Sequence, residues 1–375
     1  MTSRLFTPIE IGGMTFNNRI AVAPMCQYSA DDGSATDWHV QHWMNLAMSG
    51  AGMITVEMTD VERRGRITHG CLGLYSNANE AAAARVLAAA RRVAQPGVRF
   101  GTQLAHAGRK ASTQRPWEGG GPLTADEDPW QTIGPSAIPY ADNWHVPKAM
   151  DHHDIRRLTD AFVAAAQRAA RAGFDFVEIH GAHGYLLHEF LSPISNRRED
   201  EYGGPIENRM RLIVDVARAV RAALPARMML GTRLSVSDWV DGGLTPDEAV
   251  LVARALKAEG VAYICCSSGG NSPHQKIPAG PGYQVHFAEK VRREAGIATR
   301  AVGLIDDPLQ AEAIIADGKA DFVALARAML ADPRWPWRAA AVLGDKFHTP
   351  VQYHRAMGTM EGWGKAQAER EKSAA

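Results

Sequence analysis

Short hydrophobic runs alternate with amphipathic helical stretches along almost the whole chain. The hydrophobic runs, which predict strands, begin near Ile20, Met53, Phe100, Phe174, Met228, Ala262, Ala298 and Phe322. The helical stretches that follow them cover residues 39–49, 79–94, 151–172, 208–224, 246–259, 285–294, 308–316 and 335–342. Eight strand and helix units in 375 residues favour a closed (β/α)8 TIM barrel, because an open doubly wound sheet usually has about six strands.

Three segments fall outside this repeat. Residues 5–16 predict a small hairpin around Gly12 and Gly13, placed to close the bottom of the barrel. Residues 109–150 form a long insertion after the third strand, rich in Pro, Gly and Trp, of the kind that serves as a lid or binding loop. The charged, alanine-rich residues 365–375 predict a loosely held tail, so we expect one α/β barrel domain over residues 1–364.

Composition and charge narrow the possible functions. The formal net charge is zero, so the chain lacks the basic surface that nucleic acid or an anionic membrane requires. The N-terminus has no hydrophobic stretch of signal-peptide length, and no run approaches the roughly 18 apolar residues of a membrane span. The 4 cysteines form no CxxC motif, which argues against a disulfide framework. These features predict a cytoplasmic, soluble protein that acts on a small molecule.

The most informative segment follows the fourth predicted strand. His180 and His183 lie where its hydrophobic run ends, and Tyr185 comes next. Strict alternation would send the two histidines to opposite faces, but Gly181 and Gly184 allow the chain to turn so that both imidazoles converge. Two imidazole donors and a phenol at a strand end suggest a clamp for a carbonyl oxygen or oxyanion beside a proton source. Taken alone, the pair fits a metal site or two unrelated loop histidines about equally well.

Other residues lie at the C-terminal ends of their own strands, where barrel enzymes carry catalytic groups. They are Cys26, Gln103, Arg233 and Arg327. Alternation turns Arg233 inward, and Glu178 points inward on the neighbouring strand, so the two could simply pair in the barrel core. The ordinary alternative for Cys26 is a small buried hydrophobic side chain, and for Arg327 an arginine that starts a helix.

Several long motifs in one order indicate a known family. They are Ala23-Pro24-Met25-Cys26-Gln27-Tyr28, the octapeptide from Gln103 to Lys110, the segment around His180, and the stretch from Ser192-Pro193 to Arg209. With these motifs the chain resembles the Old Yellow Enzyme family of flavin-dependent ene-reductases, and most of all its thermophilic-like subclass. The resemblance runs from about residue 3 to about residue 355, and one short motif alone would not suffice.

The resemblance implies non-covalent FMN across the top of the barrel, reduced by NADPH or NADH and reoxidised by an activated alkene. The residues expected at the flavin are Ala23, Pro24, Met25, Cys26, Met58, Gln103, His180, Arg233, Gly303, Ala326 and Arg327. Arg327 is expected to hold the phosphate, at the position where barrels commonly bind one, with Gly303 giving close approach. Met58, after the strand MITVE, stands where relatives often have a small residue near the flavin.

The resemblance also implies roles at the substrate. His180 and His183 match the pair that grips the electron-withdrawing oxygen, and Tyr185 matches the proton donor. Cys26 matches a redox-tuning thiol, and Tyr28 a second substrate-facing phenol; an extended backbone would put these two on one face.

Near the C-terminus, Arg355 resembles an arginine that reaches a neighbouring active site, which implies a homodimer or homotetramer. An arginine on the local surface is the alternative for this short match.

No GxGxxG motif follows a strand, so the nicotinamide cofactor is expected to share the flavin pocket, which predicts ping-pong kinetics. Four other functions are alternatives to this one. A dienoyl-CoA reductase relative would need a tight run of about four cysteines for its iron–sulfur cluster, and the chain has no such run. A dihydrouridine synthase would need a basic RNA-binding surface, and the zero net charge argues against one. The others are a non-catalytic flavin-binding protein and a metal hydrolase built on His180 and His183.

Overall fold

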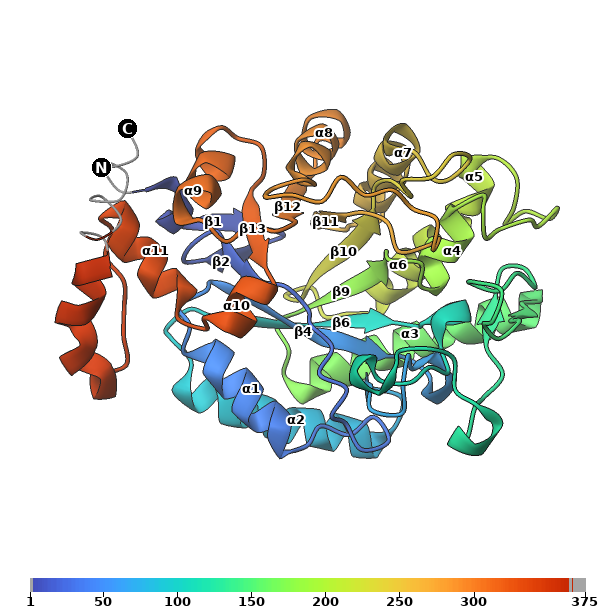
Figure 1. The fold of residues 1–375 in the computed structure, drawn as a ribbon, viewed down its shortest axis with the longest axis horizontal. Coiled ribbons are helices and arrows are strands. Elements are labelled where there is room, and N and C mark those ends of the chain that lie inside the picture. Colours follow the sequence, from blue (N-terminus) through green and yellow to red (C-terminus); the bar gives the residue numbers. More distant parts are fainter. Residues whose placement is uncertain (1–2, 364–365, 367–375) are drawn as a thin grey trace.

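The predicted barrel of parallel strands is present in the computed structural model, which describes residues 3–363 and residue 366 (Figure 1). The predicted tail, 365–375, lies outside the described residues apart from Ala366. The eight barrel strands are β3 (Ile20–Val22), β4 (Met53–Asp60), β6 (Arg99–Ala105), β9 (Phe176–Gly181), β10 (Met229–Ser235), β11 (Tyr263–Ser267), β12 (Ala298–Val302) and β13 (Phe322–Leu325). The sheet closes because β3 pairs with both β13 and β4.

Eight long helices cover this sheet, at the positions that the periodicity predicts. They are α1 (Asp37–Ala47), α2 (Asn77–Val93), α3 (His152–Ala172), α6 (Arg211–Ala223), α7 (Pro246–Ala258), α8 (Val285–Ala295), α9 (Pro308–Ala316) and α11 (Trp335–Leu343). Shorter helices α4 (Leu186–Leu191), α5 (Ile206–Arg209) and α10 (Arg327–Ala331) lie in the loops at strand ends. The predicted helix 208–224 is therefore two helices, α5 and α6, joined at Met210.

Helix α3 shows how the sequence sets these boundaries. The Asp151 side chain accepts a hydrogen bond from the Asp154 backbone N–H and caps the first turn. Gly173 ends the helix in the left-handed region, with φ of 97°. Between these ends, Leu158 and Phe162 lie one turn apart and are fully buried against the sheet.

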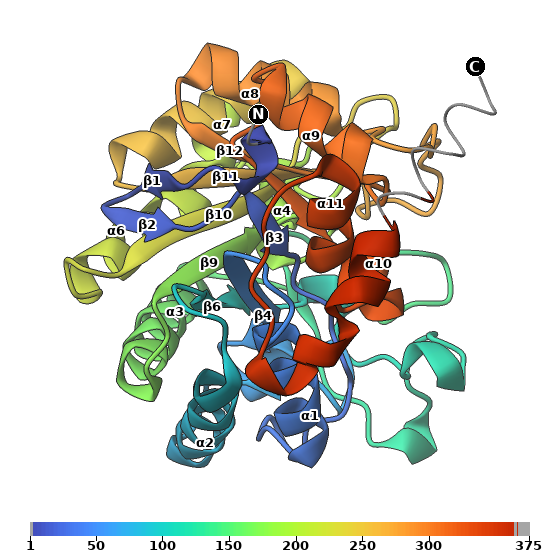
Figure 2. The same cartoon turned by 90° about the vertical axis from the view of Figure 1, so that its left-hand side faces the viewer.

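The predicted hairpin is also present, as β1 (Ile9–Ile11) and β2 (Met14–Phe16). Gly12 and Gly13 both have positive φ, which a tight two-residue turn requires and glycine adopts without strain. The hairpin's apolar side chains pack in one buried cluster with the barrel-interior residues Met229 and Phe322. Figure 2 faces this end of the barrel and shows β1 and β2 beside β10 and β11.

The interior changes from apolar to polar toward the C-terminal strand ends. The side chains of Phe176, Glu178 and His180 on β9 point into the barrel, in this order toward its C-terminal end. On β10, Met229 points inward at the level of Phe176, and Arg233 at the level of His180. The lower layer therefore closes the barrel with hydrophobic side chains. The polar groups gather at the upper end, where the strand-end loops begin.

The insertion at 109–150 is folded onto these loops. It contains the 3-10 helices η3 (Gly108–Lys110), η4 (Pro116–Glu118) and η5 (Ala125–Glu127), and the paired strands β7 (Ile133–Gly134) and β8 (Lys148–Ala149). Arg109 donates to the Asn271 backbone oxygen at 2.7 Å, and Arg115 donates to the Tyr28 backbone oxygen at 3.0 Å. These contacts tie the insertion to two different strand-end loops.

Several further short elements were not predicted. After β4 come η2 (Arg63–Gly65) and a short strand, β5 (Leu72–Gly73), which pairs with the end of β4. At the C-terminal side, residues Val351–Ala356 form the 3-10 helix η6, and Arg4–Phe6 form η1 near the N-terminus. None of the helices in the described part of the chain combines the length and hydrophobicity needed to span a bilayer.

Candidate active site

The two histidines and the tyrosine converge beyond the end of β9. The ring centroids of His180 and His183 lie 5.0 Å apart with the ring planes at 88°, and Tyr185 lies 5.1 Å from His180. The turn that brings them together is made by His183 and Gly184, with φ of 61° and 72°. Gly181 is the last residue of β9 and has no positive φ, so its expected part in the turn is wrong.

His180 is a neutral imidazole with a defined tautomer. Burial, and next the positive charge of Arg233, lower its pKa well below the ordinary value. Its Nδ1 accepts a hydrogen bond from the Ala182 backbone N–H at 3.2 Å. Because Nδ1 is the acceptor, the ring proton is on Nε2, which leaves that N–H as a donor.

His183 is neutral for the same reasons, since burial and then Arg233 lower its pKa well below the ordinary value. Its Nε2 lies 2.7 Å from Ser267 Oγ, which also accepts from Arg233 Nη2 at 3.4 Å. Ser267 Oγ can accept from Arg233 and either donate to Nε2 or accept from it, so this contact is compatible with both tautomers of His183. With its ring proton on Nδ1, His183 has an N–H for a ligand, as His180 has at Nε2.

Arg233 is buried beside this pair, with 8% of its surface exposed. Its Nε has no hydrogen-bond partner among the described residues. The core ion pair considered for Arg233 and Glu178 does not form, because Glu178 pairs with Arg300 of β12 instead. A permanent positive charge therefore remains at the upper end of the barrel for a ligand.

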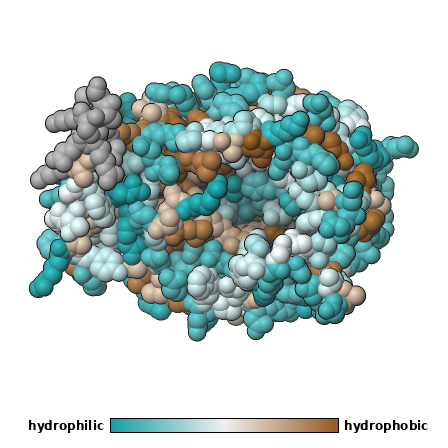
Figure 3. All heavy atoms as spheres, viewed as in Figure 1, coloured by the Kyte–Doolittle hydropathy of each residue, from teal (hydrophilic) through white to brown (hydrophobic). Residues whose placement is uncertain are grey.

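A cavity of about 550 Å³ opens next to these groups. Its lining includes Lys110, His183, Arg233, Gly303, Ala326 and Arg327. Figure 3 shows the surface hollowed near the centre of this face, with hydrophilic residues in the hollow. The volume falls in the range of small-molecule sites, about 300–1,000 Å³, and two arginines suit a phosphorylated cofactor.

Gly303 adopts a φ of 133° at the edge of this cavity. A Cβ there would lie 2.9 Å from the Gln284 side chain and 3.1 Å from the Tyr283 ring. Glycine is therefore required both by the backbone conformation and by the space.

Other predicted flavin residues lie outside this lining. Ala23 is buried just after β3, and its N–H donates to the Leu325 carbonyl at 2.9 Å. Pro24 and Met25 continue the same loop and are half-buried. Gln103 on β6 points into the barrel, where its amide donates to Glu178 Oε1 at 2.7 Å.

Cys26, Tyr28 and Tyr185 pack against one further apolar cluster, which contains Met58 and Cys71. Burial raises the pKa of the Cys26 thiol well above its ordinary value, so it remains a thiol. Tyr28 has a φ of 50°, so the extended backbone expected between Cys26 and Tyr28 is wrong, although both reach the cluster. Met58 lies within β4, at a register shift, and not after the strand.

Tyr185 precedes α4 and keeps its proton. Burial, and next the nearby Cys26, raise its pKa well above the ordinary value. The Lys110 ammonium lies 5.2 Å from the centroid of its ring and donates to the His183 backbone oxygen at 3.0 Å. Burial, and next Arg109, lower the pKa of Lys110 to about 8.

Two residues of the site, Lys110 and Ser267, were not predicted to have a role. Lys110 ends the QLAHAGRK motif, and Ser267 is the last residue of β11. A survey of every strand end would have found the serine.

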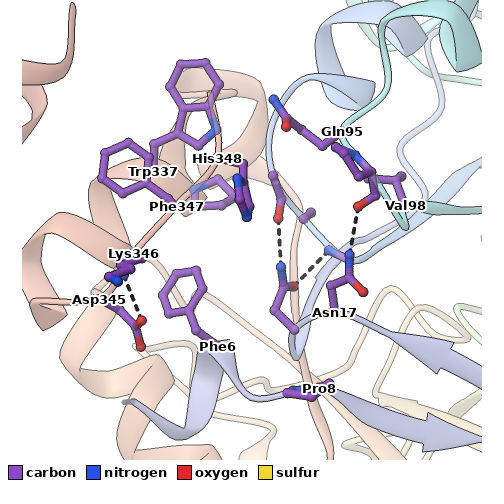
Figure 4. A pocket seen from close by; sticks show the side chains of 16 residues that line it. Phe6, Pro8, Asn17, Gln95, Val98, Trp337, Asp345, Lys346, Phe347 and His348 are labelled. Carbon is purple, nitrogen blue, oxygen red and sulfur yellow. Dashed lines mark hydrogen bonds between the residues drawn. The ribbon is translucent and has the colours of Figure 1, made fainter. Parts of the chain in front are cut away.

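Arg355 lies in η6 and is exposed. The neighbouring residues Pro350–Tyr353 line a cavity with the C-terminal ends of α1 and α2. A further cavity of about 310 Å³ on this side is lined by Phe6, Asn17, Trp337 and His348, near the N-terminal ends of β3, β4 and β6 (Figure 4). The segment that holds Arg355 is therefore at the opposite end of its own barrel from the histidine pair.

Comparison with known proteins places this barrel in a family. The model of the NADH:flavin oxidoreductase / NADH oxidase family matches residues 4–346, and the chain belongs to that family. An NADPH dehydrogenase of Geobacillus sp. (strain WCH70) is 45% identical over 357 residues, which cover 95% of this chain and 99% of the relative. The NADPH dehydrogenase of Bacillus subtilis (strain 168) is 41% identical over 357 residues, covering 95% and 99%.

Solved structures give the same result. Morphinone reductase in complex with tetrahydroNAD matches with a TM-score of 0.74 at 28% identity, over 92% of this chain and 92% of that chain. A 2-naphthoyl-CoA reductase matches with a TM-score of 0.81 at 24% identity, over 91% of this chain but 52% of that chain, and shows the fold alone. The resemblance to the Old Yellow Enzyme family is confirmed, and the protein is an FMN-dependent NAD(P)H oxidoreductase.

Proposed function

We propose that this protein is an ene-reductase, which uses NAD(P)H to reduce the double bond of an α,β-unsaturated carbonyl or nitro compound. The observation that supports this most is the pair of neutral imidazoles, His180 and His183, with ring centroids 5.0 Å apart. Tyr185 lies 5.1 Å from His180 and supplies a protonated phenol at the same place. The names of the relatives, NADPH dehydrogenase and morphinone reductase, agree with a reduction.

The cavity and its residues fit FMN. Arg233 has a buried Nε without a partner in the described part of the chain, and Gly303 and Arg327 line the same cavity. In this proposal Arg233 holds the pyrimidine side of the flavin together with Gln103, and Arg327 holds the phosphate. FMN, when bound, accepts hydride from NAD(P)H and supplies it to the β carbon of the alkene.

His180 and His183 bind the electron-withdrawing oxygen of the substrate. Negative charge develops on that oxygen as the β carbon is reduced, and each neutral ring directs one N–H toward it. Donors that are already in place lose little energy in reorganisation, so they stabilise the developing charge more than the neutral substrate. The backbone N–H of His183 donates to Ser235 Oγ at 3.0 Å and so fixes the turn that aims this ring.

Tyr185 transfers a proton to the α carbon. Its raised pKa keeps the phenol protonated at neutral pH, while a carbanion-like carbon is basic enough to take the proton. Cys26 and Tyr28, in the same apolar cluster, are assigned the redox-tuning thiol and a second substrate contact. Arg355 is assigned to a neighbouring subunit's site in a homodimer or homotetramer, because its segment lies far from its own histidine pair.

A visible-spectrum titration tests the proposal. Purified protein should be yellow, should bleach when NADPH is added without oxygen, and should recover its colour when 2-cyclohexenone is added. Initial rates with both substrates varied should give parallel double-reciprocal lines. Bleached protein that no enone or nitroalkene reoxidises would show an NAD(P)H oxidoreductase that is not an ene-reductase.

A further inference from the structure

Four polar side chains lie in the barrel interior directly below the candidate flavin site. Gln103 of β6, Glu178 of β9, Tyr263 of β11 and Arg300 of β12 are each at most 1% exposed. They come from four different strands and meet at one carboxylate. Taking such groups out of water is costly, and apolar residues of similar volume would stabilise a barrel core as well or better.

Glu178 receives hydrogen bonds at both oxygens. Its Oε1 accepts from Gln103 Nε2 at 2.7 Å, and its Oε2 accepts from the Tyr263 hydroxyl at 2.8 Å and from the Arg300 guanidinium. Arg300 is held in turn by Thr55 Oγ1, to which its Nη1 donates at 2.9 Å. The carboxylate pairs with a guanidinium and is fixed from three sides.

The strands leave room for this arrangement at one position. Gly231 of β10 stands in register between Glu178 and Tyr263. A Cβ on Gly231 would lie 2.1 Å from the Tyr263 ring, so the tyrosine reaches Glu178 only because this residue has no side chain.

The network determines which way the Gln103 amide faces. An ionised carboxylate can only accept, so the NH2 group of Gln103 must point to Glu178. The amide oxygen is then the end directed away from Glu178, and no donor reaches it from the described residues. A glutamine that is free to rotate could present either end to a ligand.

We propose that Glu178 and Arg300 are positioning residues, which hold Gln103 so that its amide oxygen accepts the N–H of the flavin pyrimidine ring. Neither residue touches the cofactor in this account, and both act through Gln103. The inference rests on the proposed placement of FMN above Gln103.

Glu178→Gln tests this with almost no change of shape. Tyr263 and Arg300 still donate, so they select the carbonyl oxygen of the new amide, and its NH2 then faces Gln103. Gln103 must rotate to accept from it and would present its own NH2 to the flavin N–H, giving two donors in contact. FMN binding to the apoprotein, measured by quenching of flavin fluorescence, should weaken about tenfold, the size expected for one hydrogen bond.

A double-mutant cycle distinguishes positioning from a general structural effect. Gln103→Leu should also weaken FMN binding about tenfold, and the double variant Gln103→Leu/Glu178→Gln should be no weaker than Gln103→Leu alone. Tyr263→Phe is the matched control, because it removes one hydrogen bond from Glu178 and leaves the Gln103 contact. It should keep the wild-type Kd within about twofold even if the unfolding temperature falls.

An unchanged Kd in Glu178→Gln, or losses that multiply to about a hundredfold in the double variant, would overturn the inference.

If Glu178→Gln does not fold, Arg300→Lys and Arg300→Met replace it. The lysine keeps the cation and should bind FMN nearly as wild type, whereas Arg300→Met leaves Glu178 to take up a proton and donate to Gln103, and should bind about tenfold more weakly. Equal Kd values for these two variants would also overturn it. Wild-type protein that binds no FMN would instead refute the proposed function.

Discussion

Glu178 and Arg300 pair inside the barrel, and this pairing leaves Arg233 without a carboxylate among the described residues. Two guanidinium groups thus stand near the top of the interior, with one charge neutralised and the other available. Arg300, whose charge is offset by Glu178, is enclosed below the site, and Arg233 lines the cavity. Substitution of Arg233 should therefore affect a bound ligand more than the stability of the fold.

Arg233→Met should make the flavin harder to reduce without weakening the fold. The change removes a buried charge whose Nε has no partner, so the free energy of unfolding of the apoprotein should stay the same or rise. FMN reduction by NADPH should slow about 10- to 100-fold, as expected for loss of a hydrogen bond from a charged group, and the flavin potential should become more negative. Dye-equilibrium potentiometry measures the flavin potential, and stopped-flow absorbance measures the rate of FMN reduction.

Arg254→Met is the control for Arg233→Met, since that guanidinium is exposed on the outer surface, where it donates to the Glu294 backbone oxygen. An Arg233→Met protein with an unchanged potential and lower stability would mean that the arginine serves the core.

His180→Ala and His183→Ala should each separate the two half-reactions. Loss of one N–H donor to the developing oxyanion typically costs about 10²–10³ in rate, so reoxidation by an enone should slow by that factor. FMN reduction by NADPH involves no such oxyanion and should change only a few-fold. Stopped-flow traces of each half-reaction give the two rates.

His286→Ala is the matched control for the two histidines, because His286 is exposed on the outer helix α8. Equal slowing of both half-reactions in His180→Ala would show that the ring positions the flavin and not the substrate oxygen.

Tyr185→Phe should remove the proton donor while keeping its packing in the apolar cluster. Reoxidation by an enone should slow by about 10²–10⁴, the usual contribution of a positioned general acid. The raised pKa keeps the wild-type phenol protonated, so the wild-type rate should show no decline from this group between about pH 7 and about pH 10. The configuration of the deuterium in product formed in D2O, read by NMR, reports whether the α carbon still takes its proton from one side. A loss of activity in Tyr28→Phe but not in Tyr185→Phe would reassign the donor.

The barrel, its hairpin and the inward side of each strand follow from local patterns. Alternation along β9 and β10 places Glu178, His180 and Arg233 inside, because neighbouring side chains of a strand point to opposite faces. The partner of Glu178 could not be predicted in this way. Arg300 lies three strands away around the barrel, and the contact depends on Gly231 leaving space between them.

The turns of the site could not be predicted from local sequence patterns either. His183 and Tyr28 both adopt positive φ, which non-glycine residues rarely do and which tertiary contacts must compensate. At His183 the compensation is visible as the hydrogen bond from its backbone N–H to Ser235 of the next strand. The shift of register at Met58 is likewise a property of the pairing of β4 with β6 and not of either sequence alone.

The last prediction concerns the pH dependence of stability through Glu189 of α4. This carboxyl is fully buried; burial raises its pKa from 4.5 to about 8, and its Oε1 accepts from the Arg109 backbone N–H at 2.8 Å. Below the unfolded pKa both states hold the proton, and the stability contribution is complete. As pH rises toward 8 the unfolded chain releases the proton while the folded protein keeps it, so stability falls by up to about 1.4 kcal/mol per pH unit.

Glu189→Gln keeps the acceptor for Arg109 and removes the titration. The free energy of unfolding in urea should be close to wild type near pH 4, and the variant should gain on wild type by up to about 1.4 kcal/mol for each pH unit from there toward pH 8, because it has no carboxyl to titrate. Glu199→Gln is the control, because that glutamate is exposed and should leave the pH profile unchanged. A Glu189→Gln profile parallel to wild type across this range would mean that Glu189 ionises in the folded protein, with Arg109 and Lys110 as its counter-charges.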